Sequence, residues 1–220
     1  MQTIEGRREG RHDNPVGNVV ERGASDPRSA EPPASCRACG FDANGLPVSD
    51  TVATILALPA AFRTLFSGSG FTVSGRVQSI DDRVRARSTP DGWSAIEYAA
   101  HVAEVLHETA MRLALIFEGA GRVLPPPHTE TANASARSAS RVAVLASVGA
   151  GATELARVVS SAPRGAWDLS AQRCDTRVTA RELLSETLHE AHHHLFDARA
   201  ALDKHGPRGP ADGRTASGAP

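Results

Sequence analysis

Histidines gathered near the C-terminal end of the sequence have a spacing that suits metal coordination. His189 and His193 are four residues apart in a segment rich in leucine and alanine, residues 178–204. In an α-helix, residues i and i+4 lie on one face about one turn apart, so both imidazoles can point at one position. Imidazole nitrogen binds zinc and other divalent cations. Two histidines do not complete such a site, so a third ligand must come from another segment.

The candidate for the third ligand is His101, which lies in the other long segment of helical periodicity. Three protein ligands leave one position of the cation open, which is the arrangement of catalytic rather than structural zinc. The sequence therefore predicts a metal site of His101, His189 and His193. Glu104 and Glu190 are close to these histidines in the sequence and are the candidates for a general base.

Two alternatives for the histidine cluster stay open. The first is a polar helix face without a metal, because the leucines of this segment fall on a different side of the helix. The second is that His192 replaces one member of the pair, since residues i and i+3 also meet. His194 points elsewhere on a helical wheel, so we expect a structural role for it. The other histidines lie in tails, in loops or off the shared face: His12, His107, His128 and His205.

Two of the three cysteines raise the question of a second metal site. Cys36 and Cys39 form a C-x-x-C pair followed by glycine, which is half of a zinc knuckle. A structural zinc site needs four protein ligands, and the sequence holds no second C-x-x-C pair. We expect a turn that anchors the N-terminal arm, and the alternative is a second, structural metal site that includes both cysteines. The odd cysteine count argues against a disulfide framework.

Two arginines precede the histidine-rich segment. Arg173 and Arg177 could clamp an acidic substrate or a cofactor carboxylate, because guanidinium groups bind carboxylates in a bidentate way. The alternative is that both are ordinary surface arginines.

Four segments of helical periodicity must position these side chains. They span residues 50–67, 93–117, 138–161 and 178–204, and apolar residues recur in them at the spacing of one helix face. With the long connections between them, they predict an all-α protein, a four-helix bundle with a long crossover. Pro59 is expected to kink or split the first helix. Two helix starts have the S/T-x-x-E spacing of a capping box, Ser94 with Glu97 and Thr179 with Glu182.

The two ends of the chain have a different composition. They contain almost no large apolar side chains and cannot bury enough surface to offset the entropy of ordering. We therefore expect a disordered arm over residues 1–35, a C-x-x-C turn over 36–50, the bundle over 51–205 and a disordered tail over 206–220.

Charge and hydropathy exclude several classes of partner. Lys and Arg number 24 and Asp and Glu 25, so the chain lacks the basic excess that nucleic-acid binding needs. No apolar run approaches the roughly 20 residues of a membrane span, and the N-terminus lacks the apolar core of a signal peptide. We expect a cytoplasmic protein that binds neither nucleic acid nor membrane.

Two motifs resemble signatures of the DinB-like (DinB/YfiT-like) superfamily of metal-binding proteins. The stretch from Trp93 to His101, WSAIEYAAH, resembles its W-S-x-x-E-(x)3-H signature. The stretch from His189 to Asp197, HEAHHHLFD, resembles its terminal H-x-x-x-H-H-x-x-D motif. The run CRACGFD at residues 36–42 resembles an actinobacterial subgroup of that superfamily.

The resemblance implies a four-helix bundle, often dimeric, that holds a divalent metal, usually zinc or nickel, with three histidines. Matched residue by residue, these are His101, His189 and His193. Characterised relatives include transferases and isomerases that use mycothiol, bacillithiol or glutathione. The chain departs from the pattern at His192, an extra histidine, and at Glu104, where many relatives have Asp.

Three functions fit these observations. The first is transfer of a low-molecular-weight thiol of the mycothiol type to a small electrophile, since an open metal position holds a thiol as thiolate at neutral pH. The second is hydrolysis, because the cation lowers the pKa of bound water to about 7. The third is a metal-binding stress-response module without activity. The expected partners are a small-molecule thiol, an electrophile and a second copy of the chain in a homodimer.

Overall fold

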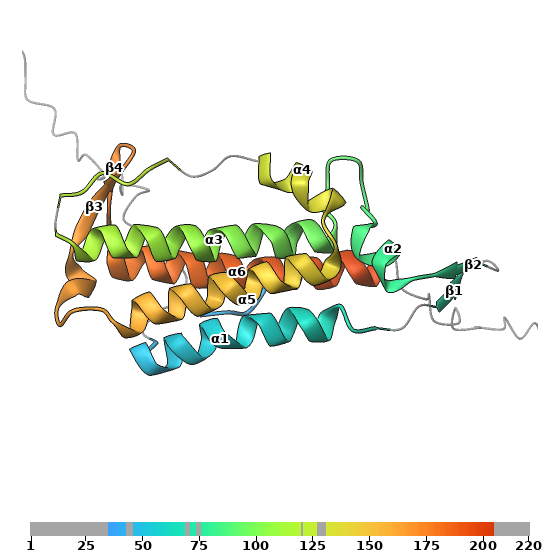
Figure 1. Cartoon of the computed structure of the whole chain (residues 1–220), viewed down its shortest axis with the longest axis horizontal. Helices are drawn as coiled ribbons and strands as arrows, with labels where there is room; N and C mark the ends of the chain where they lie inside the picture. Colours follow the sequence, from blue (N-terminus) through green and yellow to red (C-terminus); the bar gives the residue numbers. More distant parts are fainter. Residues whose placement is uncertain are drawn as a thin grey trace, which may run out of the picture. The chain divides into compact units, whose positions relative to one another are not determined.

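The computed structural model describes residues 35–42, 46–68, 71–73, 76–119, 121–126 and 131–204. Four long helices lie side by side in it (Figure 1): α1 (Val48–Leu65), α3 (Ala95–Phe117), α5 (Arg141–Ser160) and α6 (Ala180–Lys204). Both α3 and α1 contact α5 and α6, so the four helices enclose one core. The predicted all-α four-helix bundle is confirmed. The predicted N-terminal arm and C-terminal tail lie outside the described residues, apart from Ser35.

The long crossover lies between α3 and α5. Figure 1 shows these two helices running in the same direction along the bundle, while α1 and α6 run the other way. The chain must therefore return along the bundle between them, and this connection contains α4 (Thr131–Ser138). The predicted crossover is thus found at the segment that follows α3.

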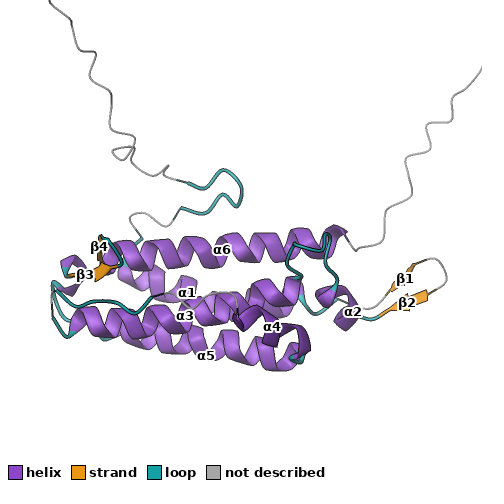
Figure 2. Ribbon diagram, turned by 90° about the horizontal axis from the view of Figure 1, so that it is seen from above, coloured by secondary structure: helices purple, strands orange, loops and turns teal. Residues whose placement is uncertain are grey.

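Short elements lie at the two ends of the bundle (Figure 2). At one end, β1 (Phe71–Val73) and β2 (Arg76–Gln78) form an antiparallel hairpin before α2 (Ile80–Arg85). At the other end, η2 (Ala166–Asp168) precedes a second hairpin, β3 (Ser170–Arg173) and β4 (Thr176–Thr179), which leads into α6. The sequence predicts no strands in these regions. Strands of three or four residues are too short for an alternating pattern to stand out.

The apolar stripe of α3 forms the centre of the core. Val102, Leu106, Leu113 and Ile116 are buried against the neighbouring helices. The predicted split at Pro59 is wrong, because α1 runs through this residue as one helix. Proline removes a single backbone donor, and the buried side chains around it hold the helix together: Ile55, Leu58 and Phe62.

Gly151 marks the closest approach of α5 to α3. A Cβ atom at this position would lie 2.9 Å from the carbonyl oxygen of Ala103 and 3.2 Å from the Cβ of Leu106. Real Cβ atoms do not come so near a backbone oxygen, so glycine is required here for steric reasons. Gly149, two residues earlier on the same helix, has open space around it.

The buried carboxylate of Glu97 holds the start of α3. Its oxygen accepts hydrogen bonds from the backbone N–H and the hydroxyl of Ser94 at 2.9 and 2.7 Å. Arg87 Nε and Arg137 Nε each lie 2.9 Å from a carboxylate oxygen. The capping box predicted at Ser94 is confirmed. Glu97 also joins the segment before α3 to α4, through two arginines that no local pattern indicated.

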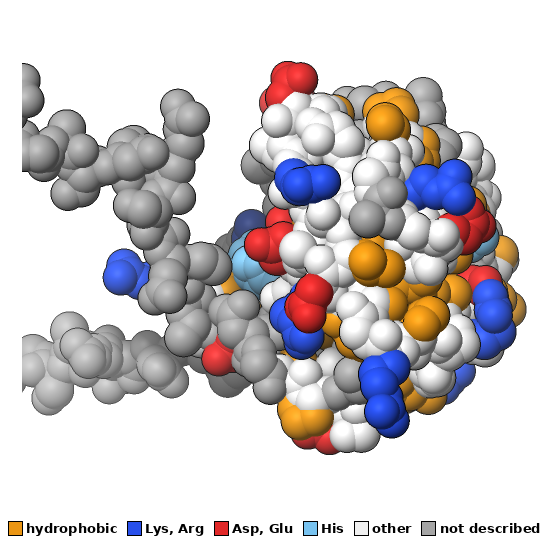
Figure 3. Space-filling view, turned by 90° about the vertical axis from the view of Figure 1, so that its left-hand side faces the viewer, with side chains coloured by type: hydrophobic (Ala, Val, Ile, Leu, Met, Phe, Trp, Pro, Cys, Tyr) orange, Lys and Arg blue, Asp and Glu red, His pale blue; other side chains and the backbone are white. Residues whose placement is uncertain are grey.

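One helix among the described residues, α5, is long and apolar enough to cross a membrane by length and composition alone. Its residues Val148, Ala152 and Leu155 are fully buried against the other helices, and core helices of soluble proteins pass the same test. Figure 3 shows basic and acidic side chains interspersed over one end of the bundle, without a large patch of either sign among the described residues of that face.

We predict opposite effects for alanine at the two glycines of α5. Gly151→Ala lowers the free energy of unfolding by about 1–3 kcal/mol, because α5 must move away from Ala103. Gly149→Ala is the matched control and raises it by up to about 1 kcal/mol through helix propensity alone. Urea denaturation of both variants measures the difference. Equal stabilisation by both substitutions would contradict the close packing.

We also predict a specific acid sensitivity from Glu97. Burial raises the pKa of Glu97, but hydrogen bonds from Arg87, Ser94 and Arg137 outweigh it and bring the pKa to about 2. The folded state thus favours the ionised form, so its contribution is complete above pH 4.5, the unfolded value, and is lost as pH falls toward 2. Glu97→Gln removes this contribution.

The expected loss at pH 7 is roughly 2–3 kcal/mol, the size of lost hydrogen bonds to a charged group. The stability of Glu97→Gln should also change less than that of the wild type between pH 5 and 3. Glu118→Gln is the control, because its ion pair with Arg122 is exposed and contributes less than about 0.5 kcal/mol. Denaturation curves at several pH values measure both effects, and identical acid profiles for wild type and Glu97→Gln would refute the assignment.

Candidate metal centres

One cluster of ligand atoms joins α3 to α6, and we name it the α3–α6 group: His101, Glu190 and His194. One ligand atom from each residue lies within 4.8 Å of the other two. His101 Nε2 lies 3.0 Å from Glu190 Oε1, and His194 Nε2 lies 4.0 Å from the same oxygen. Glu190 and His194 are one turn apart on α6, so helix geometry brings them together. Two imidazoles and a carboxylate form a donor set typical of zinc and other divalent transition metals.

Neighbouring side chains fix the orientation of the two imidazoles. His194 Nδ1 lies 3.2 Å from Asp197 Oδ2, so Nδ1–H can donate to this carboxylate while Nε2 faces Glu190. Metal-binding histidines are usually held in this way by a carboxylate on the other ring nitrogen. The ring of Trp93 packs 5.1 Å from that of His101 and 5.9 Å from that of His194. The tryptophan of the W-S motif therefore forms one wall of the group.

The protonation states within this group suit a cation. The hydrogen bond from His101 lowers the pKa of Glu190, which keeps this carboxylate ionised. Burial lowers the pKa of His194 by more than its bond to Asp197 raises it, which keeps the ring neutral near pH 7. Ionised carboxylate and neutral imidazole are the forms that bind metals.

A small cavity of about 110 Å³ lies against the α3–α6 group. Four glutamates and two arginines contribute to its lining: Glu104, Glu108, Glu186, Glu190, Arg112 and Arg173. Four negative and two positive groups leave an excess of two negative charges, which attracts a divalent cation. The cavity thus adds an electrostatic reason for a cation beside His101.

Both arginines of the cavity are engaged by glutamates. Arg173 Nη1 lies 2.5 Å from Glu186, and Arg112 Nη2 lies 2.9 Å from Glu108. Arg177 is exposed on β4 and does not line this cavity. The structure therefore brings only one of the two predicted clamp residues to the group, with its guanidinium already bound. A role of Arg173 or Arg177 in binding a carboxylate stays a prediction.

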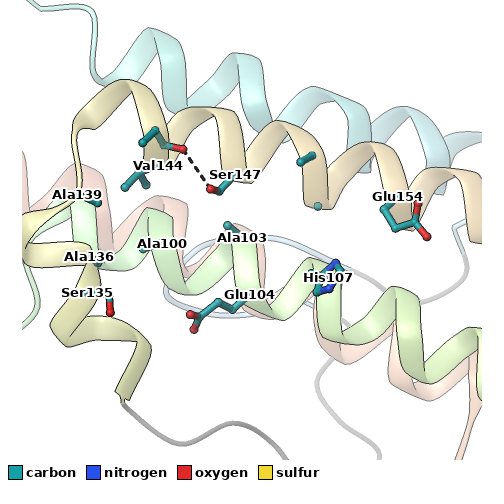
Figure 4. Close-up of a pocket in the computed structure, with 13 residues that line it drawn as sticks. Ala100, Ala103, Glu104, His107, Ser135, Ala136, Ala139, Val144, Ser147 and Glu154 are labelled. Atoms are coloured by element: carbon teal, nitrogen blue, oxygen red, sulfur yellow. Dashed lines mark hydrogen bonds between the residues drawn. The ribbon is translucent and has the colours of Figure 1, made fainter.

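A larger groove of about 630 Å³ lies between α3, α4 and α5 (Figure 4). Small side chains line most of it, including Ala100, Ala103 and Gly151. Figure 4 shows the polar side chains Glu104 and His107 on α3 along this groove. Because Glu104 also lines the small cavity, this candidate base lies between the groove and the α3–α6 group. The groove has the volume of a typical small-molecule site.

A second cluster joins the C-x-x-C turn to α6, and we name it the cysteine–histidine group: Cys36, Cys39, His189 and His193. One ligand atom from each lies within 4.8 Å of the other three. Cys36 Sγ lies 3.6 Å from His193 Nδ1. A turn is thus present at residues 36–41 and contacts the histidine helix, while its role in anchoring the N-terminal arm stays a prediction.

The two thiols of this group differ in acidity. Backbone N–H groups of Cys39 and Ala38 and the side chains of His189 and His193 lower the pKa of Cys36 to about 5. Burial raises the pKa of the Cys39 thiol. At neutral pH, Cys36 is therefore a thiolate, which is the form of cysteine that binds metals.

The structure divides the predicted triad between the two groups. His101 lies in the α3–α6 group, while His189 and His193 lie in the cysteine–histidine group. The geometry brings His101 instead to Glu190, a predicted catalytic residue, and to His194, for which a structural role was expected. The sequence signal for this pair was present, because Glu190 and His194 also have the i,i+4 relation.

Comparison with known proteins identifies the family of the chain. The sequence profile of the DinB superfamily matches residues 73–196, more than half of the chain and the part that holds Trp93, His101 and the histidines of α6. The chain belongs to the DinB superfamily. No curated protein matches the sequence at a significant level.

This member of the DinB superfamily also resembles a solved structure. It is YfiT from Bacillus subtilis, described as a probable metal-dependent hydrolase with an unusual four-helix bundle topology. The similarity covers 74% of this chain and 90% of YfiT, with a TM-score of 0.59 and 13% sequence identity. At this identity, the likeness establishes the shared fold.

Proposed function

We propose that this chain is a metal-dependent enzyme whose α3–α6 group holds a divalent cation, zinc or nickel. The observation that carries the proposal is the convergence of His101, Glu190 and His194 from two helices, beside a cavity with excess negative charge. Three protein ligands leave at least one position for water or substrate, as in catalytic zinc sites. The contact of His194 with Asp197 supports this role, because it fixes the ring in a ligating orientation.

Hydrolysis is the reaction that this site supports best. A bound cation would supply a Lewis acid that lowers the pKa of water to about 7. Glu104 lines both the groove and the cavity beside His101, so it is placed to take a proton between substrate and site. The description of YfiT as a probable metal-dependent hydrolase agrees with this reaction class.

Transfer of a low-molecular-weight thiol such as mycothiol to a small electrophile is the second candidate. The observation in its favour is that the Glu190 side chain is 44% exposed, so the group is open to a thiol larger than water. An open metal position stabilises a thiol as the thiolate nucleophile. The carboxylate excess of the cavity favours hydrolysis over this reaction, because it repels an anionic thiol.

We predict that activity depends on the metal and on His101. Removal of metal by a chelator, or His101→Ala, abolishes turnover of a responsive ester or amide substrate, and added zinc or nickel restores only the wild type. Glu104→Gln lowers kcat by roughly 10²-fold or more without lowering metal content, the size expected for loss of a general base. Met111→Ala, at an exposed position of α3 that lines neither the groove nor the cavity, is the control with unchanged activity.

The same proteins distinguish the alternatives. Conjugation of mycothiol to monochlorobimane, lost in His101→Ala, would identify the thiol transferase. A chelator that lowers the melting temperature without any turnover would identify a non-enzymatic metal-binding module. Metal-dependent activity that survives His194→Ala but not His189→Ala would favour the triad of His101, His189 and His193 over the α3–α6 group.

We further predict that Asp197 tunes metal affinity. Asp197→Asn weakens metal binding about 10–100-fold, because the carboxylate that orients His194 and also faces His193 is lost. Asp203→Asn, an exposed position on the same helix, is the control. Competition with a chromophoric chelator measures both affinities, and equal values for the two variants would contradict the assigned role.

A further inference from the structure

We propose that Cys36, Cys39, His189 and His193 form a structural zinc site, separate from the α3–α6 group, that fastens the N-terminal turn to α6. This site lies outside the matched region of the superfamily on its cysteine side, because the profile begins at residue 73.

The donor set and its spacing are those of structural zinc. Two thiols and two imidazoles satisfy the four positions of a tetrahedral cation, and Cys₂His₂ is one of the common structural sets. Two residues separate the cysteines and three separate the histidines, which are typical separations for each half of such a site. Two thiolates also balance the charge of Zn²⁺, so the closed site is neutral.

The distances are compatible with one cation among the four donors. For zinc–sulfur and zinc–nitrogen bonds of about 2.3 and 2.05 Å, the sulfur–nitrogen edge of a tetrahedron is about 3.6 Å. Cys36 Sγ lies 3.6 Å from His193 Nδ1. All four ligand atoms lie within 4.8 Å of one another, so small side-chain rotations are enough to close the tetrahedron.

The second nitrogen of His193 faces a carboxylate, at a distance longer than a hydrogen bond. His193 Nε2 lies 3.7 Å from Asp197 Oδ2, which leaves Nδ1 directed at the cysteine sulfur. A carboxylate hydrogen-bonded to the non-ligating nitrogen fixes the tautomer of metal-bound histidine, and Asp197 would need to move closer to His193 to do so. His189 lies one turn earlier on α6, with its ring centroid 5.7 Å from that of His193.

The backbone of the turn and one aromatic contact hold the two cysteines next to α6. Gly40 has a positive φ of 71° and its N–H donates to the carbonyl of Cys36 at 2.7 Å, which closes the turn. Phe41 stacks on His192 with ring centroids 3.9 Å apart and an interplanar angle of 5°. This stacking docks the turn on α6 independently of any cation, so the four ligands are brought together in advance.

Cobalt substitution tests the site in the whole protein. Wild-type protein reconstituted with Co²⁺ should show thiolate-to-cobalt charge-transfer absorption together with the intense d–d bands of a tetrahedral ion. X-ray absorption of the zinc form should require two sulfur and two nitrogen ligands for one class of zinc. These measurements need no variant, so a folding defect cannot obscure them.

Variants separate this site from the one in the proposed function. The wild type should bind two zinc ions per chain, and the Cys36→Ser/Cys39→Ser variant one, with loss of the charge-transfer band. Cys174→Ser, an exposed cysteine outside both groups, should keep two ions and the band. The His101→Ala/His194→Ala variant should bind one ion and keep the band, so failure of the α3–α6 group leaves this result unchanged.

Three outcomes would overturn the proposal. One is a wild-type cobalt protein without a charge-transfer band. Another is a Cys36–Cys39 disulfide in protein purified under reducing conditions and loaded with zinc. The last is loss of the band in the His101→Ala/His194→Ala variant while circular dichroism shows the fold intact, which would mean one shared site.

Discussion

Successive residues of an α-helix point about 100° apart, and this rotation decides what each histidine of α6 does. His192 turns to Phe41, His193 to the C-x-x-C turn, and His194 to His101 on α3. His192 and His193 therefore both contact the turn at residues 36–41, while His194 faces α3. Helix geometry thus directs the three adjacent histidines of α6 to different neighbours, although they follow one another in the sequence.

The position of α3 is the second condition for this arrangement. His101 meets α6 only if α3 starts at the correct residue, and Glu97 fixes that start by accepting bonds from Ser94, Arg87 and Arg137. Gly151 then lets α5 pack closely against the opposite side of α3. The polar cap and the close helix contact thus hold His101 from two directions, although neither takes part in the chemistry of the site.

The architecture could be predicted from short-range sequence patterns, because the apolar periodicity and the capping residues of a helix lie in one contiguous segment. The bundle, the crossover after α3 and the capping boxes at Ser94 and Thr179 could all be predicted in this way. The two hairpins could not, since strands of three or four residues hold too little pattern. Oligomeric state and cellular location stay predictions.

The candidate sites were predicted only in part, for a different physical reason. The i,i+4 rule identified His189 with His193 as neighbours, but it applies equally to Glu190 with His194. Which pair faces α3 depends on the rotation of α6 about its axis, which long-range packing sets. The partners of Cys36 and Cys39 lie about 150 residues away in the sequence, a separation at which spacing carries no information.

Asp197 lies between the α3–α6 group and the cysteine–histidine group and is close to one histidine of each. The same atom, Oδ2, lies 3.7 Å from His193 Nε2 and 3.2 Å from His194 Nδ1. A single carboxylate oxygen therefore lies close to two imidazoles that belong to different clusters. Removal of this one carboxylate would therefore alter the surroundings of a histidine in each cluster at the same time.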